Sequence, residues 1–345
     1  MRLSRAAGRP GSGARERARA SENERPDTGE VFYPAPVQSA VIIGNLDGVH
    51  RGHQAVLRQA RAIADARGLA TRVLTFDPHP SEVLRGSAPP RLATLERRIE
   101  LLRRHGADEV IVEPFTPAFA ALTPERFVKE LLVERLGAKA VVVGENFRFG
   151  AKRAGDLAAL RGFGATYGFE VAAAEVAGDE RGAFSSTRVR EAIASGDLDE
   201  ASRLLGRRHS ISGIVEGGDR RGRTIGFPTA NLGGVTEVLP PYGVYAVFAD
   251  GRPGVMNLGV RPTVDGKSLR VEVHLFDFDG DLYGKPMRVH LVRRIREEKK
   301  FAGLDELKAQ IASDAATARN ILAGARAGDG AEPIEPIEST DPIEP

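Results

Sequence analysis

The sequence predicts two domains: an α/β domain with a parallel sheet, then a small antiparallel β-barrel that ends in one helix. From about residue 38 to 205, short β-branched runs alternate with amphipathic helical segments. This alternation is typical of a parallel sheet with helices on both faces. From about residue 206 the chain consists of short strands separated by turns, which is typical of a small barrel. One helical pattern over 304–324 follows the last strand.

Each element of the first half can be placed in order. Strands are expected at 41–44, 71–76, 109–112, 138–144 and 169–176, and helices at 53–68, 94–106, 123–137 and 156–163. The third helix has Thr123 at its N-cap and Pro124 at its first helical position, both favourable there. In parallel sheets ligands bind beyond the carboxyl ends of the strands. Polar motifs that follow these strands are therefore the candidates for a binding site.

The second half shows strand patterns without intervening helices. Strands are expected within 243–250, 254–259, 268–280 and 281–295. Asp-Gly pairs at 250–251 and 279–280 predict hairpin turns, because both residue types tolerate the left-handed backbone that tight hairpins need. We expect domain bounds of 38–205 and 206–325. The Arg-rich start, 1–37, and the acidic Pro-rich end, 326–345, lack hydrophobic periodicity and are predicted to be disordered.

Composition narrows the class of protein. The chain has no cysteine, which excludes disulfides and cysteine-based zinc sites. No apolar run approaches the ~20 residues that span a bilayer, and we recognise no signal peptide at the start. The net charge of +2 says little about partners, and the predominance of arginine among the basic residues suggests codon bias more than a nucleic-acid surface. We expect a cytoplasmic protein that binds neither membranes nor nucleic acids, and its oligomeric state stays open.

The first candidate site is the stretch VIIGNLDGVHRGHQ at 41–54, where a strand ends and a helix begins. His50 and His53 lie three residues apart at the helix start, so both can project from one face. A helix N-terminus attracts anions, and two imidazole donors there suit phosphate oxygens. Gly52 allows a phosphate to approach the backbone closely. Surface histidines are the alternative interpretation of this motif alone.

The second candidate is FSSTRVREAIASGD at 184–197. Its serines and threonine can act as ordinary N-caps. Arg188 and Arg190 in the first turn need another explanation, because the helix dipole disfavours cations there unless an anion lies nearby. Hydroxyl groups and guanidinium groups at one helix start therefore suggest a polyphosphate ligand.

Together, GNLDGVHRGH and SSTRVR resemble the signatures of the nucleotidyltransferase superfamily. With TFDPHP (75–80) and VGENFRFGAKRAGD (143–156), the first half resembles the FAD synthetase module of bifunctional riboflavin kinase/FAD synthetases. Leu46 stands where phenylalanine is expected. The resemblance implies that an FMN phosphate attacks the α-phosphate of ATP and releases pyrophosphate, with His50 and His53 as catalytic donors. The resemblance implies nucleotide- or flavin-binding roles for Gly44, Asn45, Asp47, Gly52, Asp77, His79, Asn146, Arg148, Ser186, Thr187 and Arg190.

The barrel half carries GGDRRGRTIGFPTANL at 217–232, a glycine-rich cationic segment suited to covering phosphates. A mobile hairpin loop is the alternative interpretation. In the following PTAN, Thr229 and Asn231 share one face if the segment is extended, and both offer oxygen ligands that Mg²⁺ accepts. Glu272 and His274 alternate with Val271, Val273 and Leu275 along a strand. The sequence has no GxxxxGK[ST] motif, which excludes a P-loop kinase.

These segments, with MNLGVRPT, VEVHLFDF and the final helix, resemble the riboflavin kinase module. The resemblance implies that Thr229 and Asn231 hold Mg²⁺–ATP and that Glu272 is the catalytic base for the ribityl hydroxyl. The phosphate-covering segment it implies contains Gly222, Arg223, Thr224, Gly226, Phe227 and Pro228.

We therefore expect a bifunctional enzyme that converts riboflavin to FMN and FMN to FAD with ATP as co-substrate. Two alternatives remain. One is an adenylyltransferase for another acceptor, whose barrel binds tRNA or protein. The other is a non-catalytic flavin or nucleotide sensor built on both modules. The paired candidate metal ligands and base disfavour the first, and the intact polar residues at both sites disfavour the second.

Overall fold

The computed structural model describes residues 37–217, 227–263 and 266–328. These residues form an α/β domain with a parallel sheet, a closed antiparallel barrel and a last helix, as the sequence predicts. In this part of the chain no helix combines the length and the apolar character that crossing a membrane requires. Most residues of the two ends that were predicted to be disordered lie outside the described ranges, but residues 326–328 continue the last helix. The predicted domain bounds stay predictions.

The parallel sheet has the strand order β3-β2-β1-β4-β5. Its strands are β1 (Ser39–Ile43), β2 (Ala70–Asp77), β3 (Glu109–Pro114), β4 (Ala138–Gly144) and β5 (Glu170–Ala174). In the central strand β1, Ile42 lies opposite Val73 of β2 and Val142 of β4. All five residues of β1 are buried, which explains why its sequence from Ala40 to Ile43 is a continuous apolar run rather than an alternating one.

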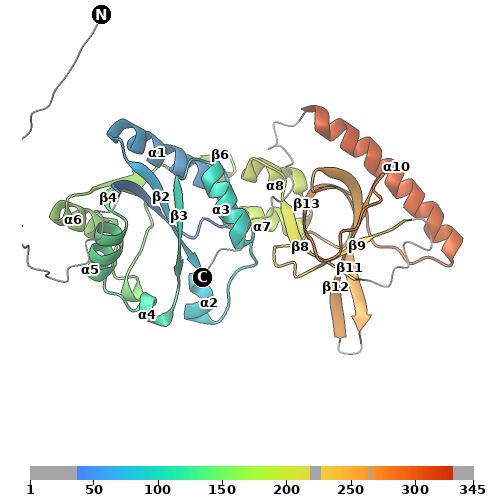
Figure 1. Cartoon of the computed structure of the whole chain (residues 1–345), viewed down its shortest axis with the longest axis horizontal. Helices are drawn as coiled ribbons and strands as arrows, with labels where there is room; N and C mark the ends of the chain where they lie inside the picture. The colour runs from blue at the N-terminus through green and yellow to red at the C-terminus, as the bar shows by residue number, and fades with distance from the viewer. Residues whose placement is uncertain (1–36, 218–226, 264–265, 329–345) are drawn as a thin grey trace, which may run out of the picture. The chain divides into compact units, whose positions relative to one another are not determined.

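Helices cover both faces of this sheet (Figure 1). On one face, α1 (Arg51–Arg67) and α3 (Leu95–Arg104) bury Leu57 and Leu101 against Ile42. On the other face, η2 (Phe127–Arg135) and α6 (Leu157–Tyr167) bury Leu132 and Leu160. The short helical segments are η1 (Asp47–Val49), α2 (Pro80–Arg85), α4 (Pro117–Ala120), α5 (Pro124–Arg126) and η3 (Ala151–Arg153).

The helix predicted over 123–137 begins as expected but changes type. Thr123 caps it by accepting a hydrogen bond from the backbone N–H of Arg126, and Pro124 opens α5. From Phe127 onward the turns are π-helical rather than α-helical. The N–H of Leu136, for example, donates to the carbonyl of Leu131, a five-residue step that residue propensities do not reveal.

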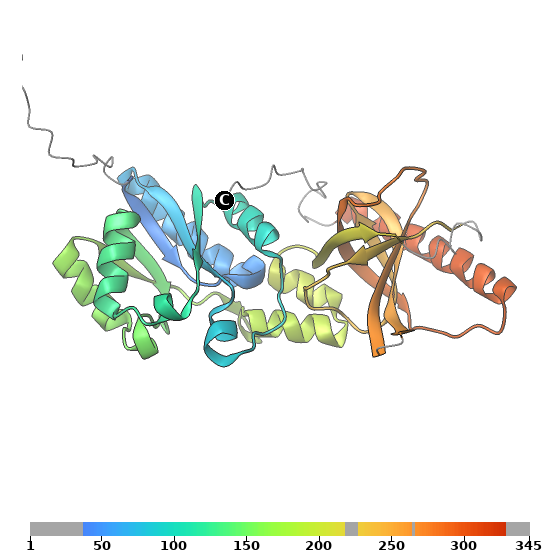
Figure 2. The same ribbon diagram turned by 60° about the horizontal axis from the view of Figure 1, so that its bottom comes forward.

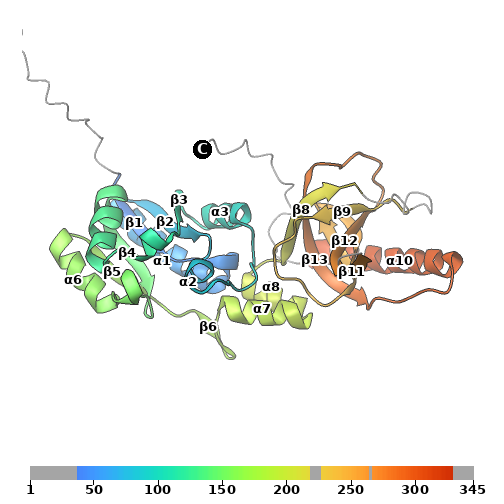
Figure 3. The same ribbon diagram turned by 90° about the horizontal axis from the view of Figure 1, so that it is seen from below.

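A helical pair and a small hairpin follow the sheet. The hairpin consists of β6 (Gly178–Asp179) and β7 (Gly182–Ala183), and the pair consists of α7 (Ser186–Ser195) and α8 (Leu198–Leu205). Figure 3 shows the two helices side by side. Val189, Ile193 and Leu204 are fully buried and form the core between them.

The barrel closes in the order β10-β11-β12-β9-β8-β13, and every neighbouring pair is antiparallel. Its strands are β8 (Ser210–Glu216), β9 (Ala230–Gly233), β10 (Gly243–Ala249), β11 (Arg252–Thr263), β12 (Gly266–Leu275) and β13 (Pro286–Arg296). The last helix, α10 (Leu304–Gly328), lies along the outside of the barrel (Figure 2). It buries Ala318 and Leu322 against Phe248 and Val255.

One of the two predicted hairpin turns is confirmed. Asp250 and Gly251 have φ values of 44° and 76° and join β10 to its partner β11, as a tight hairpin with two left-handed residues requires. The prediction at 279–280 is wrong. β12 pairs with β11 and β9, whereas β13 pairs with β10 and β8. Gly280 therefore belongs to a longer connection between strands that are not neighbours, not to a tight turn.

Candidate active sites

The histidine turn lies at the carboxyl end of β1, where its chain turns into α1. His50 is the N-cap of α1, and its Nδ1 accepts a hydrogen bond from the backbone N–H of Gly52 at 3.2 Å. Because Nδ1 is the acceptor, the neutral ring carries its proton on Nε2. The His53 ring stacks on it, with ring centroids 3.7 Å apart and an interplanar angle of 25°. The two imidazoles therefore form one unit, as their spacing predicts.

Both rings are neutral near pH 7. Burial lowers the pKa of His50 to about 4, and the nearby guanidinium groups of Arg207 and Arg190 contribute. Burial also holds the pKa of His53 well below its usual value, with a smaller contribution from His50. Neutral imidazoles donate a hydrogen bond through one nitrogen each. The Nε2–H group of His50 is thus the donor that this ring can offer to a ligand.

The glycines of the turn have packing roles of their own. A Cβ atom at Gly52 would lie 3.0 Å from the His50 ring and 3.0 Å from the carbonyl oxygen of Phe184. The sequence predicted glycine here because a phosphate must approach the backbone closely. This crowding is a second reason why the position requires glycine. Gly44 directly follows β1 and donates its N–H to the carbonyl of Leu74 on β2.

The start of α7 lies against the histidine turn, although more than 130 residues separate the two motifs. Ser186 Oγ donates a hydrogen bond to the backbone carbonyl of Asp47 at 3.0 Å. Arg190 forms an ion pair with the buried Asp47 carboxylate at 2.5 Å. Ser185, one residue before the predicted site residues, is the actual N-cap, and the Thr187 side chain is exposed. The structure therefore brings together the two motifs that the sequence singles out.

Arg188 does not support the sequence argument for a phosphate. Its guanidinium contacts the carboxylates of Asp179 at 3.2 Å and Glu200 at 3.1 Å. Arg203 bonds to the same two carboxylates. Carboxylates of the chain itself thus supply the anion that the helix start requires, and Arg188 needs no ligand.

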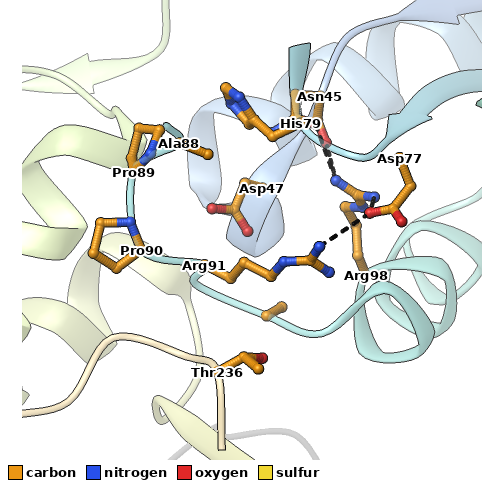
Figure 4. A pocket seen from close by; sticks show the side chains of 11 residues that line it. Asn45, Asp47, Asp77, His79, Ala88, Pro89, Pro90, Arg91, Arg98 and Thr236 are labelled. Carbon is orange, nitrogen blue, oxygen red and sulfur yellow. Dashed lines mark hydrogen bonds and ion pairs between the residues drawn. The ribbon is translucent and has the colours of Figure 1, made fainter. Parts of the chain in front are cut away.

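A cavity of about 210 Å³ opens beside this region (Figure 4). Four predicted site residues line it, namely Asn45, Asp47, Asp77 and His79. Its other lining residues are Ala88, Pro89, Pro90, Arg91, Ala93, Arg98 and Thr236. The cavity lies beyond the carboxyl ends of β1 and β2, where ligands of parallel sheets bind. Within it, His79 caps α2 by accepting the N–H of Ser81, and burial lowers the pKa of His79.

Arg98 organises the cavity and was missed from the sequence. Its guanidinium is buried and donates to the carbonyl and side-chain oxygens of Asn45, both at 3.1 Å, and to the carbonyl of Phe76. It also lies 3.8 Å from the Asp77 carboxylate. A signal was present, because Arg98 occupies the apolar stripe of α3 together with Leu101 and Leu102, where a charged residue is unusual.

Asn146 and Arg148 follow β4, at the edge of the sheet where they were predicted. Both side chains are exposed, and Arg148 donates a hydrogen bond to the backbone carbonyl of its neighbour Phe147. Neither residue lines the cavity of Figure 4. Their predicted nucleotide-binding role stays a prediction.

In the barrel, Asn231 and Glu272 share one face, and Thr229 directly precedes β9. Ala230 and Leu232 point into the barrel core, so the Asn231 side chain between them points away from it. Asn231 lies opposite Glu272 in the register of β9 and β12. The Glu272 carboxylate accepts a hydrogen bond from Arg270 at 2.6 Å.

The segment before Thr229 is held by a residue of the same strand as Glu272. The Pro228 carbonyl lies 2.8 Å from His274 Nδ1, and the Phe227 ring lies edge-on to the imidazole. Gly222, Arg223, Thr224 and Gly226 of the predicted phosphate-covering segment lie outside the described residues.

The donor groups of this face suit magnesium bound to a nucleotide. Within the described residues, no group of three or more His, Asp or Glu side chains is arranged to hold a metal by itself. Mg²⁺ commonly needs only one or two protein oxygens, because phosphates and water complete its shell. The hydroxyl of Thr229 and the carboxamide of Asn231 meet that requirement.

Known proteins match this arrangement along most of the chain. Residues 34–188 match the FAD synthetase family model and residues 205–322 match the riboflavin kinase family model. The chain is 46% identical over 295 residues to the bifunctional riboflavin kinase/FMN adenylyltransferase of Escherichia coli K12, which covers 84% of this chain and 94% of that protein. The protein of the same name from Bacillus subtilis is 38% identical over 288 residues, covering 80% and 90% respectively.

A solved structure from Streptococcus pneumoniae, described as a macrolide-efflux protein, is also similar. It has 34% sequence identity and a TM-score of 0.75, and it covers 83% of this chain and 95% of its own. Two family models in the expected order and relatives covered almost end to end lead to one conclusion. The chain belongs to the family of bifunctional riboflavin kinase/FMN adenylyltransferases.

Proposed function

We propose that the two sites act on one flavin in consecutive steps, each with its own set of residues. The barrel phosphorylates riboflavin to FMN, and the α/β domain transfers an adenylyl group from ATP to FMN, giving FAD and pyrophosphate. Both family matches support this function. The assignment of the two reactions to two sites rests on one observation: the candidate residues form two separate groups. The stacked histidines lie at the end of β1, and Asn231 lies opposite Glu272 on the barrel.

In the kinase step, Glu272 accepts the proton of the ribityl 5′-hydroxyl as its oxygen attacks the γ-phosphorus of ATP. The new O–P bond forms while the bond from the γ-phosphorus to the departing ADP oxygen breaks. Thr229 and Asn231 hold the magnesium that neutralises the nucleotide's phosphate charge. Arg270, bonded to one carboxylate oxygen of Glu272, orients the base.

In the adenylyl step, an FMN phosphate oxygen attacks the α-phosphorus of ATP, and pyrophosphate leaves. The attacking oxygen is already ionised, so this step needs no strong base. Catalysis rests on positioning and on stabilising charge on the phosphates. The Nε2–H of His50 and the His53 ring contact the phosphates. Ser186, Thr187 and Arg190 bind the β- and γ-phosphates from the start of α7.

The cavity of Figure 4 is the proposed place of the acceptor flavin phosphate. Asn45, Asp77 and His79 line it next to the Asp47–Arg190 ion pair. A non-catalytic sensor and an adenylyltransferase for another acceptor gain no support from the relatives, whose names state both flavin activities. A cytoplasmic location and the absence of nucleic-acid partners stay predictions from the sequence.

The test is a time course with the purified chain, riboflavin, ATP and Mg²⁺, in which flavins are separated by chromatography and detected by fluorescence. We expect FMN to appear first and FAD to follow. Chelating Mg²⁺ with EDTA should stop FMN formation, and excess Mg²⁺ should restore it. FMN without FAD would contradict the assignment of the α/β domain, and no conversion by folded protein would favour the sensor.

A further inference from the structure

We infer that His274 is a positioning residue of the riboflavin kinase site, which fixes the segment leading into Thr229 and Asn231 through a hydrogen bond to Pro228. This inference rests on the proposed kinase function. His274 follows the proposed base, Glu272, by two positions on β12. Its proposed role is not to contact the ribityl hydroxyl or the γ-phosphate but to position the residues that bind the nucleotide.

The hydrogen bond between His274 and Pro228 lies just beyond the point where the pairing of β9 with β12 ends. β9 pairs with β12 at Asn231 and Ala230, opposite Glu272 and Val273, and then the pairing ends. Pro228 has no backbone N–H, so it cannot donate to a continued ladder. His274 Nδ1 lies 2.8 Å from the Pro228 carbonyl oxygen. Because a carbonyl can only accept, Nδ1 must carry the proton.

The imidazole of His274 contacts two aromatic rings. On one side its ring lies edge-on to Phe276, with centroids 5.8 Å apart. Phe276 is buried in the cluster that α10 forms with the barrel, and the Arg319 guanidinium lies 4.3 Å from its ring. On the other side the imidazole lies edge-on to Phe227, with centroids 5.5 Å apart. His274 thus links the apolar cluster between α10 and the barrel to the two residues that precede Thr229.

This link matters because Thr229 stands beyond the last paired residue of β9. The ladder with β12 fixes Asn231 and Ala230 but does not extend to Thr229. The position of its hydroxyl therefore depends on how the Phe227–Pro228 backbone is held. Small misplacements of such groups are costly in phosphoryl transfer, where most catalysis is positioning.

Three substitutions separate the hydrogen bond from the packing. In His274→Asn the amide nitrogen can replace Nδ1, in His274→Gln the amide lies near the Nε2 position instead, and His274→Phe keeps the ring contacts without a donor. We expect His274→Phe and His274→Gln to raise the KM for MgATP in FMN formation by about tenfold. The KM for riboflavin should change less, and His274→Asn should recover most of the loss. Conversion of added FMN to FAD by the same chains should stay at the wild-type rate.

A second readout does not depend on activity. Backbone amide hydrogen exchange of the peptide that spans residues 229–233, followed by mass spectrometry, should be faster in His274→Phe and His274→Gln and close to wild type in His274→Asn. Leu269→Ala, at an exposed position of the same strand, is the matched control and should change neither readout. Wild-type kinetics and exchange in His274→Phe would overturn the inference, and so would equal losses in all three variants.

Thr229→Ala and Asn231→Ala separate failure of this inference from failure of the kinase site. If both leave FMN formation unchanged, the proposed site itself is wrong, and the inference falls with it. If both impair FMN formation while His274→Phe does not, the site stands and only the role of His274 is refuted.

Discussion

The histidine turn depends on one residue without a side chain. Gly52 lies at the second position of α1, where its N–H donates to His50 and its Cα faces the loop before α7. The same hydrogen bond fixes the tautomer that leaves the Nε2–H of His50 available to a ligand. Adding a single methyl group at this position should therefore displace the His50 ring that is proposed to contact the phosphates of ATP.

We predict that Gly52→Ala lowers the rate of FAD formation from FMN by roughly 10–100-fold. The new Cβ would lie 3.0 Å from the His50 ring and from the Phe184 carbonyl, so the ring or the loop must move. Steady-state assays with FMN and ATP measure this loss. Riboflavin phosphorylation by the same variant should not change, because the barrel is not involved.

Gly162→Ala provides the matched control for this prediction. Gly162 lies within α6, and a Cβ atom there would meet nothing within 4 Å. Alanine should stabilise this helix by roughly 0.5–1 kcal/mol and leave both activities intact. Equal activity of Gly52→Ala and Gly162→Ala would refute the proposed role of the turn.

At the scale of elements, α7 begins with two arginines that its dipole disfavours. The structure resolves this through a partner element, the β6–β7 hairpin, whose Asp179 carboxylate bonds to Arg188 and Arg203. These arginines hold the pKa of Asp179 far below its usual value. Arg190 instead turns toward Asp47 at the histidine turn. The two arginines therefore differ in function: one ties elements together and one faces the site.

Arg188→Gln should accordingly lower the midpoint of thermal unfolding while leaving the KM for ATP in FAD formation unchanged. Calorimetry and steady-state kinetics measure the two quantities. Arg61→Gln is the control, since Arg61 forms an exposed ion pair on α1, and such pairs contribute little to stability. A higher KM for ATP with an unchanged unfolding midpoint would instead make Arg188 a phosphate ligand.

At the scale of the whole molecule, local patterns were sufficient to predict both architectures. The switch from strand–helix alternation to short strands near residue 206 has its counterpart in a parallel sheet and a closed barrel. The alternation of Glu272 and His274 with Val271 and Val273 correctly predicted which strand residues face the core. These features depend on residues close in sequence, where periodicity carries the information.

What escaped prediction depends on contacts between distant segments. The Asp47–Arg190 ion pair joins residues 143 positions apart, and the Arg98 contacts with Asn45 and Phe76 also cross between elements. At the Asp-Gly pair at 279–280 the sequence predicted a feature that the structure lacks. The residues of a turn do not show whether the strands on either side of it pair with each other. In each of these cases the structure depends on which distant segments of the chain contact one another.

The central claim is that two independent sites on one chain carry out consecutive reactions on one flavin. The measurement that tests it most directly compares both reactions in Glu272→Gln, with riboflavin and FMN supplied in separate assays. We predict that kcat for FMN formation falls by roughly 10²–10⁴-fold while FMN-to-FAD conversion stays nearly intact. Glu297→Gln, whose side chain is 84% exposed, should change neither rate. If both reactions fell together in a folded Glu272→Gln protein, or if FMN formation persisted, the two-site account would be contradicted.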